Sequence, residues 1–586
     1  MRVRADLPED NRGTFVLNDF SGGMRRDTEP FRLEDNQYTI MSNGRARFGS
    51  IIPLKLPLEM TGLLPAGKYQ GLYGYDTVLI AIISGRVYGM DLSQATPAFQ
   101  IIPDVLLDEF ADTIYAELVP SSWQNLQRKL SDGTDVTAGI KLFSQVFGTP
   151  ACLILQDGIG QPWLIFTTGS ARRAHTFSDW SNTELEGQDT REYVPVGRQM
   201  MYSADGRLYI ISADSKEIYR SVTGRPLDFV VAIDQNGDKL APLTSGKEEA
   251  SRLSYKVSFE PITCIAALPS APRVQDEEAG FYLGSRKRSW IIYPHYRTPL
   301  FGEPAFTNQF LFSSGPINQF SITDVLGDVG IVTESGITTF NSILTASNEG
   351  QNLPFHSAVH KLFVRPDGSD IVQTLTASIA SNDYSLFAMD TIHGSGILVY
   401  DTLRKAFVSF DIYPEVEGQI RQFAEIKVNG KRRLFFITTG NQLFEYEAGE
   451  TAMCSVYTKE IQSDDAETEI IPRRIRLVFS DIQESGEVAV TEIVNNVLGD
   501  RKTATVSVDI PIQTIPLSIP FGDLVAENIK NKTFTIERPN KGQQVGLLIE
   551  FNFIASLQKV ELVSEGDLKA TTDDEAGVIF NNVKTL

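Results

Sequence analysis

The chain has 586 residues, of which 42% are hydrophobic and 22% are charged, so it can build large cores and is not a disordered protein. At about 150 residues per domain, this length predicts roughly three to four folded units. The formal net charge of −21 argues against a protein that wraps nucleic acid, because such a protein needs a basic face.

Residues 1–65 form the first predicted unit, an N-terminal arm. Within the arm, Leu33 to Asn43 is a candidate short helix with Asp35 as its cap. Because the arm has too few apolar residues for a core of its own, we expect it to strap onto another subunit. The alternative is that it closes the next domain within its own chain. The predicted inter-subunit contacts are Phe20, Gly22, Gly23, Arg25, Arg26, Arg45 and Arg47.

The types of these residues motivate the prediction. Two consecutive glycines at 22 and 23 let the backbone take positive φ or pass close to a neighbour. Arg25 and Arg26 are a dense basic pair in an otherwise acidic arm. Arg45 and Arg47 alternate along an extended segment, which places their side chains on one face. Charged side chains at such an edge set register and specificity more than affinity.

From about residue 66 to residue 450, short alternating apolar runs are broken by Gly, Asn, Asp and Pro, which predicts β-strands. Seven segments share an apolar strand, a polar turn and a second apolar or aromatic strand. They begin at Ile80, Ile165, Tyr209, Phe281, Ile331, Leu386 and Phe435. Most of the intervals are close to the roughly 40–50 residues of a four-stranded propeller blade. The sequence therefore predicts an all-β chain with a β-propeller of six or seven blades.

The longest interval predicts a helical or irregular insertion at 94–160, with candidate helices at Asp108 to Val119 and Ser121 to Leu130. That interval also has room for one more blade. A single hairpin would expose an apolar face and unpaired strand edges, and radial closure removes both problems. The alternative architecture is a string of separate β-sandwiches.

Residues 451–586 form the third predicted unit, a C-terminal β-sandwich with a tail. The acidic segment from Ala448 to Ile470 predicts a linker or an exposed crossing strand. Six alternating runs over about 100 residues then indicate one sandwich. These runs are RRIRLVFSD, GEVAVTEIVNNV, KTATVSVDIPI, KTFTIERP, QQVGLLIEFNFIA and LQKVELVSE. The segment from Lys569 to Leu586 predicts an extended tail.

Cysteine content and hydropathy indicate where the chain folds. The three cysteines, Cys152, Cys264 and Cys454, match neither a metal-binding pattern nor a disulfide framework, which predicts a reducing cytosol. Residues 1–13 lack the apolar segment of a signal peptide. The longest aliphatic run, Val78 to Ile83, is far below the roughly 20 residues of a membrane span. We therefore expect a soluble chain made inside a cell.

Three local patterns are similar to known sites, and each lacks a key residue. The loop at 62–69 has the spacing of a phosphate-binding loop but ends in Tyr instead of the hydroxyl residue that binds Mg²⁺. His356 and His360 have the spacing of zinc ligands without a nearby third ligand, and we expect them at the surface. The loop from Asp234 has Ser245 where a calcium loop needs a bidentate Glu. We predict no catalytic site, no metal and no cofactor.

The most specific motif lies between Leu17 and Pro57. It combines an F-x-GG-(M/L) turn, a Pro, a helix start with Leu and Asp, an Asn, and a Gly that returns the chain to a strand. Its residues are Phe20, Gly22, Gly23, Met24, Pro30, Leu33, Asp35, Asn43 and Gly49. This motif resembles the opening of tail tubular and nozzle proteins from short-tailed phages. Glu34 stands where that family has a Pro.

Two further stretches are similar to the same family. Ile218 to Phe229 looks like its blade strand, which ends in a Ser, a Gly/Pro turn and an Asp-Phe pair. The runs RRIRLVF and GLLIEFNFIASLQKVELVSE are similar to the first and last strands of its C-terminal sandwich. The resemblance covers most of the chain.

The resemblance implies a structural virion protein that forms a sixfold ring, the nozzle, at the distal end of a short tail and is assembled in the host cytoplasm. It implies three kinds of protein partner: further copies of the chain, the adaptor ring on the portal side, and tail fibres or a needle. DNA would leave through the channel, where negative charge repels phosphates and prevents trapping. Two alternatives are a carbohydrate-binding or carbohydrate-active propeller and a cellular propeller scaffold.

Overall fold

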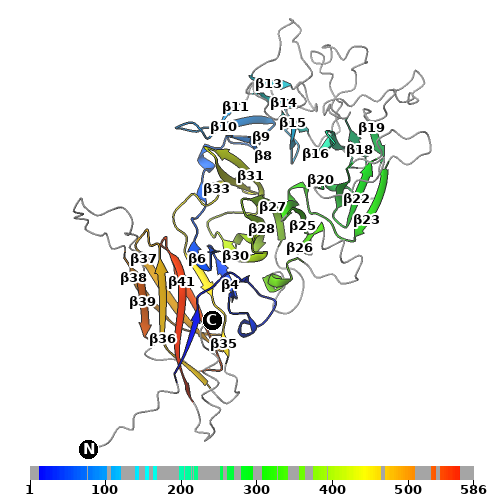
Figure 1. Cartoon of the computed structure of the whole chain (residues 1–586). Helices are drawn as coiled ribbons and strands as arrows, with labels where there is room; N and C mark the ends of the chain where they lie inside the picture. The colour runs from blue at the N-terminus through cyan, green and yellow to red at the C-terminus, as the bar shows by residue number, and fades with distance from the viewer. Residues whose placement is uncertain are drawn as a thin grey trace, which may run out of the picture.

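The computed structural model consists of a β-propeller and a β-sandwich (Figure 1). The helices bounded within its described residues are short 3-10 turns, and none has the length and hydropathy of a membrane span. They are η2 (Pro30–Arg32), η3 (Thr61–Leu63), η5 (Gln319–Ser321) and η6 (Ser357–Leu362). The described residues are 12–75, 77–101, 107, 109–119, 139–143, 152–156, 163–167, 197–203, 205–212, 214–215, 217–221, 251–254, 260–268, 279–294, 306–325, 327–334, 336–340, 355–362, 374–391, 394–462, 469–507, 530–535 and 542–567.

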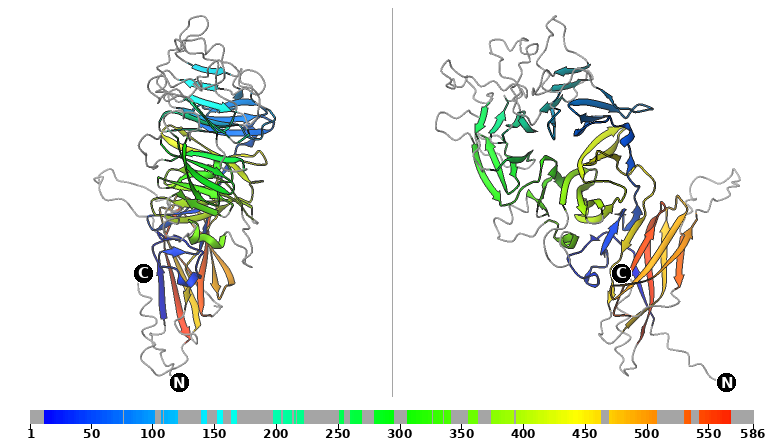
Figure 2. Two further views of the ribbon diagram at one scale, coloured as in Figure 1. Left: turned by 90° about the vertical axis from the view of Figure 1, so that its right-hand side faces the viewer. Right: turned by 180° about the vertical axis from the view of Figure 1, so that it is seen from behind.

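Seven small antiparallel sheets, here called blades 1 to 7, follow one another around a common axis (Figure 2). Blade 1 contains β8 (Tyr69–Tyr75), β9 (Val78–Ile83), β10 (Arg86–Asp91) and β11 (Gln100–Ile101). Blade 2 contains β12 (Tyr115–Val119), β15 (Trp163–Thr167), β14 (Cys152–Gln156) and β13 (Gly139–Phe143). Blade 3 contains β16 (Gly197–Tyr202), β17 (Leu208–Ser212), β18 (Glu217–Arg220) and β19 (Ser251–Ser254).

The remaining four blades complete the ring. Blade 4 contains β20 (Ile262–Ala267), β21 (Phe281–Ser285), β22 (Arg288–Pro294) and β23 (Phe306–Phe312). Blade 5 contains β24 (Ile322–Val325), β25 (Asp328–Thr333) and β26 (Gly336–Thr339). Blade 6 contains β27 (Thr374–Ser381), β28 (Tyr384–Thr391), β29 (Gly394–Asp401) and β30 (Ala406–Ile412). Blade 7 contains β31 (Ile420–Val428), β32 (Lys431–Thr438), β33 (Leu443–Glu445) and β7 (Leu58–Glu59).

The predicted propeller is confirmed, with seven blades among the described residues. Six of the seven predicted hairpins are pairs of neighbouring strands within one blade, namely β9–β10, β17–β18, β21–β22, β25–β26, β28–β29 and β32–β33. The segment from Ile165 contributes to β15, and its second half lies outside the described residues. Tight turns such as Asn429–Gly430, with φ values of 52° and 77°, match the twist of the strands that they join.

The ring closes between blade 7 and blade 1 through both backbone and side chains. Strand β7, from the N-terminal segment, pairs with β33 and becomes the outermost strand of blade 7. Gln422 of β31 joins the inner strands. Its Oε1 accepts from the Leu72 backbone N–H at 3.0 Å and from the Tyr69 hydroxyl at 2.7 Å, and its Nε2 donates to the Leu72 carbonyl. This amide takes the place of a backbone pair that two separate sheets cannot form.

The same device joins other blades. Gln319 in η5 accepts from the Ile265 N–H at 3.0 Å and donates to the Ile265 carbonyl at 2.9 Å, which links blade 4 to the start of blade 5. Gln199 of β16 donates to the Thr263 carbonyl at 3.1 Å between blades 3 and 4. Glutamine amides, two of them buried and Gln319 half-buried, therefore satisfy backbone groups at several blade boundaries.

We expect Gln422→Leu to lower the free energy of unfolding by about 3 kcal/mol, because it leaves the Leu72 backbone and the Tyr69 hydroxyl without partners in a buried site. The measurement is the urea midpoint compared with wild type. Gln100→Leu is the matched control, since Gln100 is an exposed glutamine of blade 1. Equal effects from the two substitutions would show that the amide bridge does not hold the ring closed.

In the part of the chain that the structure describes, the sandwich has two six-stranded sheets. The first has the order β39 (Lys530–Thr535), β36 (Glu469–Ser480), β41 (Ser556–Asp567), β6 (Ser50–Pro53) and β5 (Gly44–Arg47), with β1 (Arg12–Leu17) also paired to β41. The second has the order β38 (Val497–Val506), β37 (Gly486–Val494), β40 (Gln544–Phe551), β34 (Cys454–Tyr457) and β4 (Ile40–Ser42), with β35 (Ile461–Gln462) also paired to β40. All six predicted C-terminal strands are present.

The arm is part of this sandwich, and it does not form a separate unit. Strands β1, β5 and β6 belong to the first sheet, β4 belongs to the second, and the short strands β2 (Gly23–Met24) and β3 (Gln37–Tyr38) pair with each other. One hydrophobic core joins the three parts of the chain: it contains Phe15 and Phe20 from the arm, Phe551 from the sandwich, and Phe407 and Phe436 from the propeller. The arm therefore finds within its own chain the apolar surface that we expected from a neighbouring subunit.

Three local predictions are wrong. The predicted helix at Asp108 to Val119 is wrong, because Tyr115–Val119 is β12 and pairs with β15. The described part of the 94–160 insertion contains β11 to β14 together with turns and irregular segments. Short apolar runs do not distinguish the periodicity of a helix from that of a strand, and pairing with a neighbouring strand decides which one forms. Leu33 to Asn43 forms β3 and β4, while Asp35 pairs with Lys459 at 2.6 Å. The segment expected to be a linker or an exposed crossing strand contains β34, which lies inside the second sheet of the sandwich and alternates buried with half-buried residues. The segment Ser121–Leu130 lies outside the described residues.

Candidate functional site at the propeller–sandwich junction

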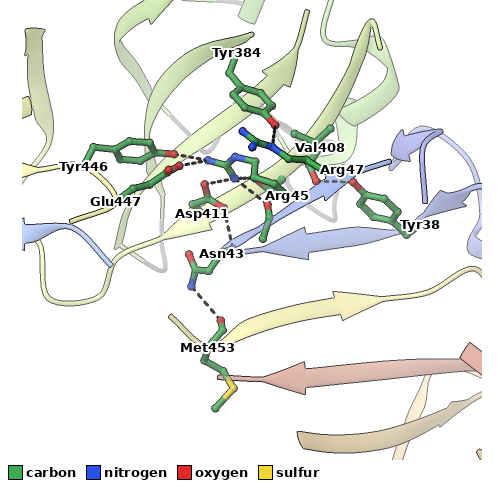
Figure 3. A network of polar contacts seen from close by, with 12 residues as sticks. Tyr38, Asn43, Arg45, Arg47, Tyr384, Val408, Asp411, Tyr446, Glu447 and Met453 are labelled. Atoms are coloured by element: carbon green, nitrogen blue, oxygen red, sulfur yellow. Dashed lines mark hydrogen bonds and ion pairs between the residues drawn. The ribbon is translucent and has the colours of Figure 1, made fainter. Parts of the chain in front are cut away.

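Arg45 of β5 lies where the arm meets blades 6 and 7 (Figure 3). Its side chain is only 4% exposed. Nη1 donates to Asp411 Oδ2 at 2.9 Å and to Ser409 Oγ at 2.6 Å, both in β30. Nη2 donates to the Tyr446 hydroxyl and lies 3.5 Å from Glu447 Oε1, just beyond β33. One guanidinium thus binds the ends of two blades to the arm.

Asp411 is the fully buried counter-charge of Arg45. Its Oδ1 accepts from the Asn43 backbone N–H at 2.8 Å, so both carboxylate oxygens bind the arm. Asn43 has a positive φ of 54°, and its Nδ2 donates at 3.3 Å to the Met453 carbonyl on the sandwich side (Figure 3). The Tyr38 hydroxyl adds a bond of 2.8 Å to the Val408 carbonyl of β30. The arm therefore connects the propeller to the sandwich through polar contacts as well as apolar ones.

Electrostatics keep Arg45 charged despite its burial. Burial by itself lowers the pKa of a guanidinium, but the carboxylate of Asp411 and the nearby Tyr446 and Glu447 raise the pKa of Arg45 well above its ordinary value. Burial also raises the pKa of the Tyr446 hydroxyl, which stays neutral and can accept from Arg45. A buried ion pair with these hydrogen bonds is a site where removal of one partner is costly.

Phe20, Gly22 and Gly23 form the bend of the arm. Phe20 is 1% exposed, and its N–H donates to the Gly49 carbonyl at 3.1 Å. Gly23 has a φ of 80°, and a Cβ there would lie 2.7 Å from the Phe407 carbonyl of β30. A side chain at this position would therefore force the arm away from blade 6. At Gly22 a Cβ would lie 2.4 Å from Asn36 Oδ1 within the arm.

The four predicted arginines have different environments. Arg25 forms an ion pair of 2.5 Å with Asp27 at the surface. Arg26 is more buried than Arg25, and its backbone N–H donates to the Ala358 carbonyl in η6 at 2.6 Å. The predicted alternation of Arg45 and Arg47 is confirmed, because both guanidinium groups lie over the Tyr384 ring, 5.4 and 5.8 Å from its centroid.

These positions correct the predicted contact set. The side chains of Phe20 and Arg45 are buried in their own chain and present no surface to a second copy, and Gly22 and Gly23 pack against Asn36 and β30. The physical reason is the burial gained in the core shared by arm, sandwich and propeller. Arg47 is exposed and Arg25 is half-exposed, so these side chains can still reach another molecule.

A groove of about 770 Å³ lies beside this network. Its walls come from the arm strands β5 and β6, the β27–β28 turn and the β31–β32 hairpin. The cations that line it are Arg45, Arg47, Lys55, Lys431, Arg432 and Arg433, against only two carboxylates, Glu445 and Glu447. The groove is therefore basic in a chain whose net charge is −21. Such a surface can bind a carboxylate-rich or phosphate-rich partner.

Part of this positive charge is neutralised locally. Arg433 forms a bidentate ion pair with Glu445 at 2.6 Å, and Arg432 lies 3.3 Å from Glu425. Within the ranges that the structure describes, Lys55 and Lys431 form no ion pair, and the Arg47 guanidinium donates a hydrogen bond only to the Tyr384 hydroxyl. These three cations give the groove its net positive charge.

The other candidate groups have structural environments. His356 is 3% exposed, not at the surface as expected, and its ring lies against Gly336 and the Ile337 backbone. His356 is buried because its ring packs against β26 of blade 5. Trp290 is 4% exposed and packs in the core of blades 3 and 4. Within the described ranges, no three His, Cys, Asp or Glu side chains are grouped to hold a metal ion. The loop from Asp234 lies outside those ranges.

Glu117 of β12 is expected to make stability depend on pH. Burial raises its pKa to about 8, although the Tyr202 N–H donates to it at 3.3 Å. The folded chain therefore keeps a proton that the unfolded chain releases, so stability is highest on the acid side and falls as the pH rises toward 8. Because Glu117 retains some exposure, we expect a loss of about 1–2 kcal/mol. Glu117→Gln should remove this pH dependence, measured as the melting temperature between pH 5 and 9. If the melting temperatures of the variant and the wild type fall in parallel as the pH rises, the prediction is wrong.

The comparisons with known proteins add little beyond the fold. No family model matches the chain, and no curated protein matches it. Among solved structures, the chain is similar to the WD40 domain of Neurospora crassa Pan2, with 8% identity and a TM-score of 0.30, over 69% of this chain and 95% of that one. The order of the seven sheets identifies the propeller independently of this likeness.

Sequence reasoning missed the partners of the arm. Asp411, Tyr446 and Tyr384 had no motif around them, and the cations of the β31–β32 hairpin had no local signal beyond the run Lys431-Arg432-Arg433. An alternating pair such as Arg45 and Arg47 indicated one shared face, but it did not indicate which surface that face contacts.

Proposed function

We propose that this chain is a structural protein of a short-tailed phage virion, where it forms the nozzle ring at the distal end of the tail. The observation that carries the proposal is the position of the family-like motif. The motif residues from Phe20 to Gly49 lie where the arm, the propeller and the sandwich share one core. A motif with a purely local role would not need Gly23 packed against β30 of blade 6.

The charge of the chain fits passage of DNA through the ring. If a share of the net charge of −21 per copy lines the channel, phosphates are repelled and the genome slides without trapping. The protein partners in this proposal are further copies of the chain in a sixfold ring, the adaptor ring on the portal side, and tail fibres or a needle. The site of action is the virion tail, after assembly in the host cytoplasm.

Electron microscopy of the purified full-length protein at high concentration tests this function. The expected result is closed rings with a central channel. A chain that stays monomeric at every concentration would contradict self-assembly into a nozzle. Specific binding or cleavage of a glycan by that monomer would favour the carbohydrate alternative, which the burial of Trp290 does not support.

A further inference from the structure

Phe48 is the most exposed large hydrophobic side chain among the described residues, with 97% of its surface accessible. It occupies the first position of the two-residue turn between β5 and β6, where φ is 49° for Phe48 and 80° for Gly49. Comparable turns in this chain have Ser84, Asn429 and Asn495 at that position. A bulky aromatic residue is disfavoured at positive φ, and here it gains no burial from its own chain.

A second exposed apolar side chain lies on the neighbouring turn. Leu403, between β29 and β30, is 73% exposed. The two turns are connected, because the side chain of Arg404 donates to the Ala46 carbonyl of β5. On the other side, the Thr402 N–H donates to the Asp383 carbonyl at 2.8 Å, next to Tyr384 in the groove wall. Phe48 and Leu403 therefore belong to one surface with the groove.

Cations neighbour these two side chains in the chain and line the adjoining groove. Arg47 precedes Phe48 and lines the groove, and Lys405 lies two residues after Leu403 in an exposed position. Lys55 and Lys431 lie within the groove itself. In the described part of the chain, none of the four forms an ion pair with a carboxylate. The Phe48 face, as we call Arg47, Phe48, Leu403, Lys405, Lys55 and Lys431 together, combines two exposed apolar side chains with four cations.

We propose that the Phe48 face is the surface through which one copy of this chain docks onto a second copy. The inference rests on the proposed ring and specifies its interface. Charge complementarity supports a second copy as the occupant, because a chain of net charge −21 that has a cationic face must carry its excess carboxylates elsewhere. The contact is head-to-tail: this face of one copy meets a different, acidic surface of the next, which is the arrangement that closes rings.

The apolar anchors favour a protein occupant over DNA. A phosphate backbone is bound by cations and polar groups, and exposed Phe and Leu side chains contribute little to that binding. In protein interfaces, by contrast, aromatic side chains supply much of the binding energy while rim charges set register and association rate. The experiments must therefore distinguish docking of a second copy on this face from binding of duplex DNA.

Photo-crosslinking in the full-length protein tests the contact directly. The photoreactive residue p-benzoyl-phenylalanine replaces Phe48, and the same residue replaces Leu498 as a matched control, since Leu498 is 63% exposed in the β37–β38 hairpin of the sandwich. The expected result is copy-to-copy crosslinks from position 48 alone, with the crosslinked peptide rich in carboxylates. Rings that form without any crosslink from position 48 would overturn this inference and leave the proposed function standing.

Association measurements give the second readout. Phe48→Ser with Leu403→Ser should weaken ring formation about tenfold or more, because truncation of anchors dominates interface energies. Val497→Ser with Leu498→Ser should leave it unchanged. Lys431→Glu should weaken association most at low salt, where screening is small. If the wild type never associates, the proposed ring fails as well. If the double variant loses duplex-DNA binding but still forms rings, the face belongs to nucleic acid.

Discussion

Arg45→Ala is expected to lower the free energy of unfolding by about 3–5 kcal/mol, because it leaves the fully buried Asp411 carboxylate without its counter-charge. The substitution also removes the hydrogen bonds from Arg45 to Ser409 and Tyr446, although the bonds of Asn43 and Tyr38 to β30 remain. Urea unfolding of the full-length chain, followed by tryptophan fluorescence and circular dichroism, measures the effect.

Two further variants make this prediction specific. Arg476→Ala removes an ion pair of 3.3 Å with Glu561 whose arginine side chain is 44% exposed, and we expect a loss of about 1 kcal/mol or less. Arg45→Met combined with Asp411→Leu replaces both charges by apolar groups and should be less destabilising than Arg45→Ala, because no charge is left buried alone. A double variant as unstable as the single one would show that packing, not the ion pair, holds the junction.

Deletion of residues 1–50 is expected to prevent the chain from folding, and not only to prevent its assembly. The deletion removes β1 from β41, β4 from β34 and β5 from β6, and it empties part of the shared core. The lost side chains include Phe15, Leu17, Phe20, Tyr38 and Met41, all buried. At about 1.5–3 kcal/mol each, their sum is comparable to the whole stability of a protein.

Deletion of residues 1–11 is the control, since it removes none of the described strands. We expect the shorter deletion to have a melting temperature close to that of the full chain, and the longer one to give insoluble or protease-sensitive protein. A soluble, cooperatively melting propeller from the longer deletion would mean that blades 1 to 7 fold without the arm. The arm would then act mainly in assembly, as its composition alone had predicted.

The fold was predictable to the extent that it depends on short-range patterns. The hairpin from Phe281 has alternating apolar residues and a polar turn, and it forms β21 and β22 as expected. The segment around Ile114 and Leu118 has spacing compatible with both a helix and a strand, and its pairing with β15 decided in favour of the strand. Apolar residues of the arm were too sparse for a separate core, and that observation was correct, but it did not indicate which surface would supply the missing burial.

The amino-acid sequence by itself therefore determined the all-β class, the hairpins of the blades and the six C-terminal strands, because side-chain alternation and turn residues act over a few neighbouring positions. The tertiary structure alone decided that the arm completes both the sandwich and blade 7, and that Arg45 binds Asp411 across 366 positions of the chain. No local pattern encodes such a pair. Its energy appears only when the closed ring and the sandwich exclude water from the junction between them.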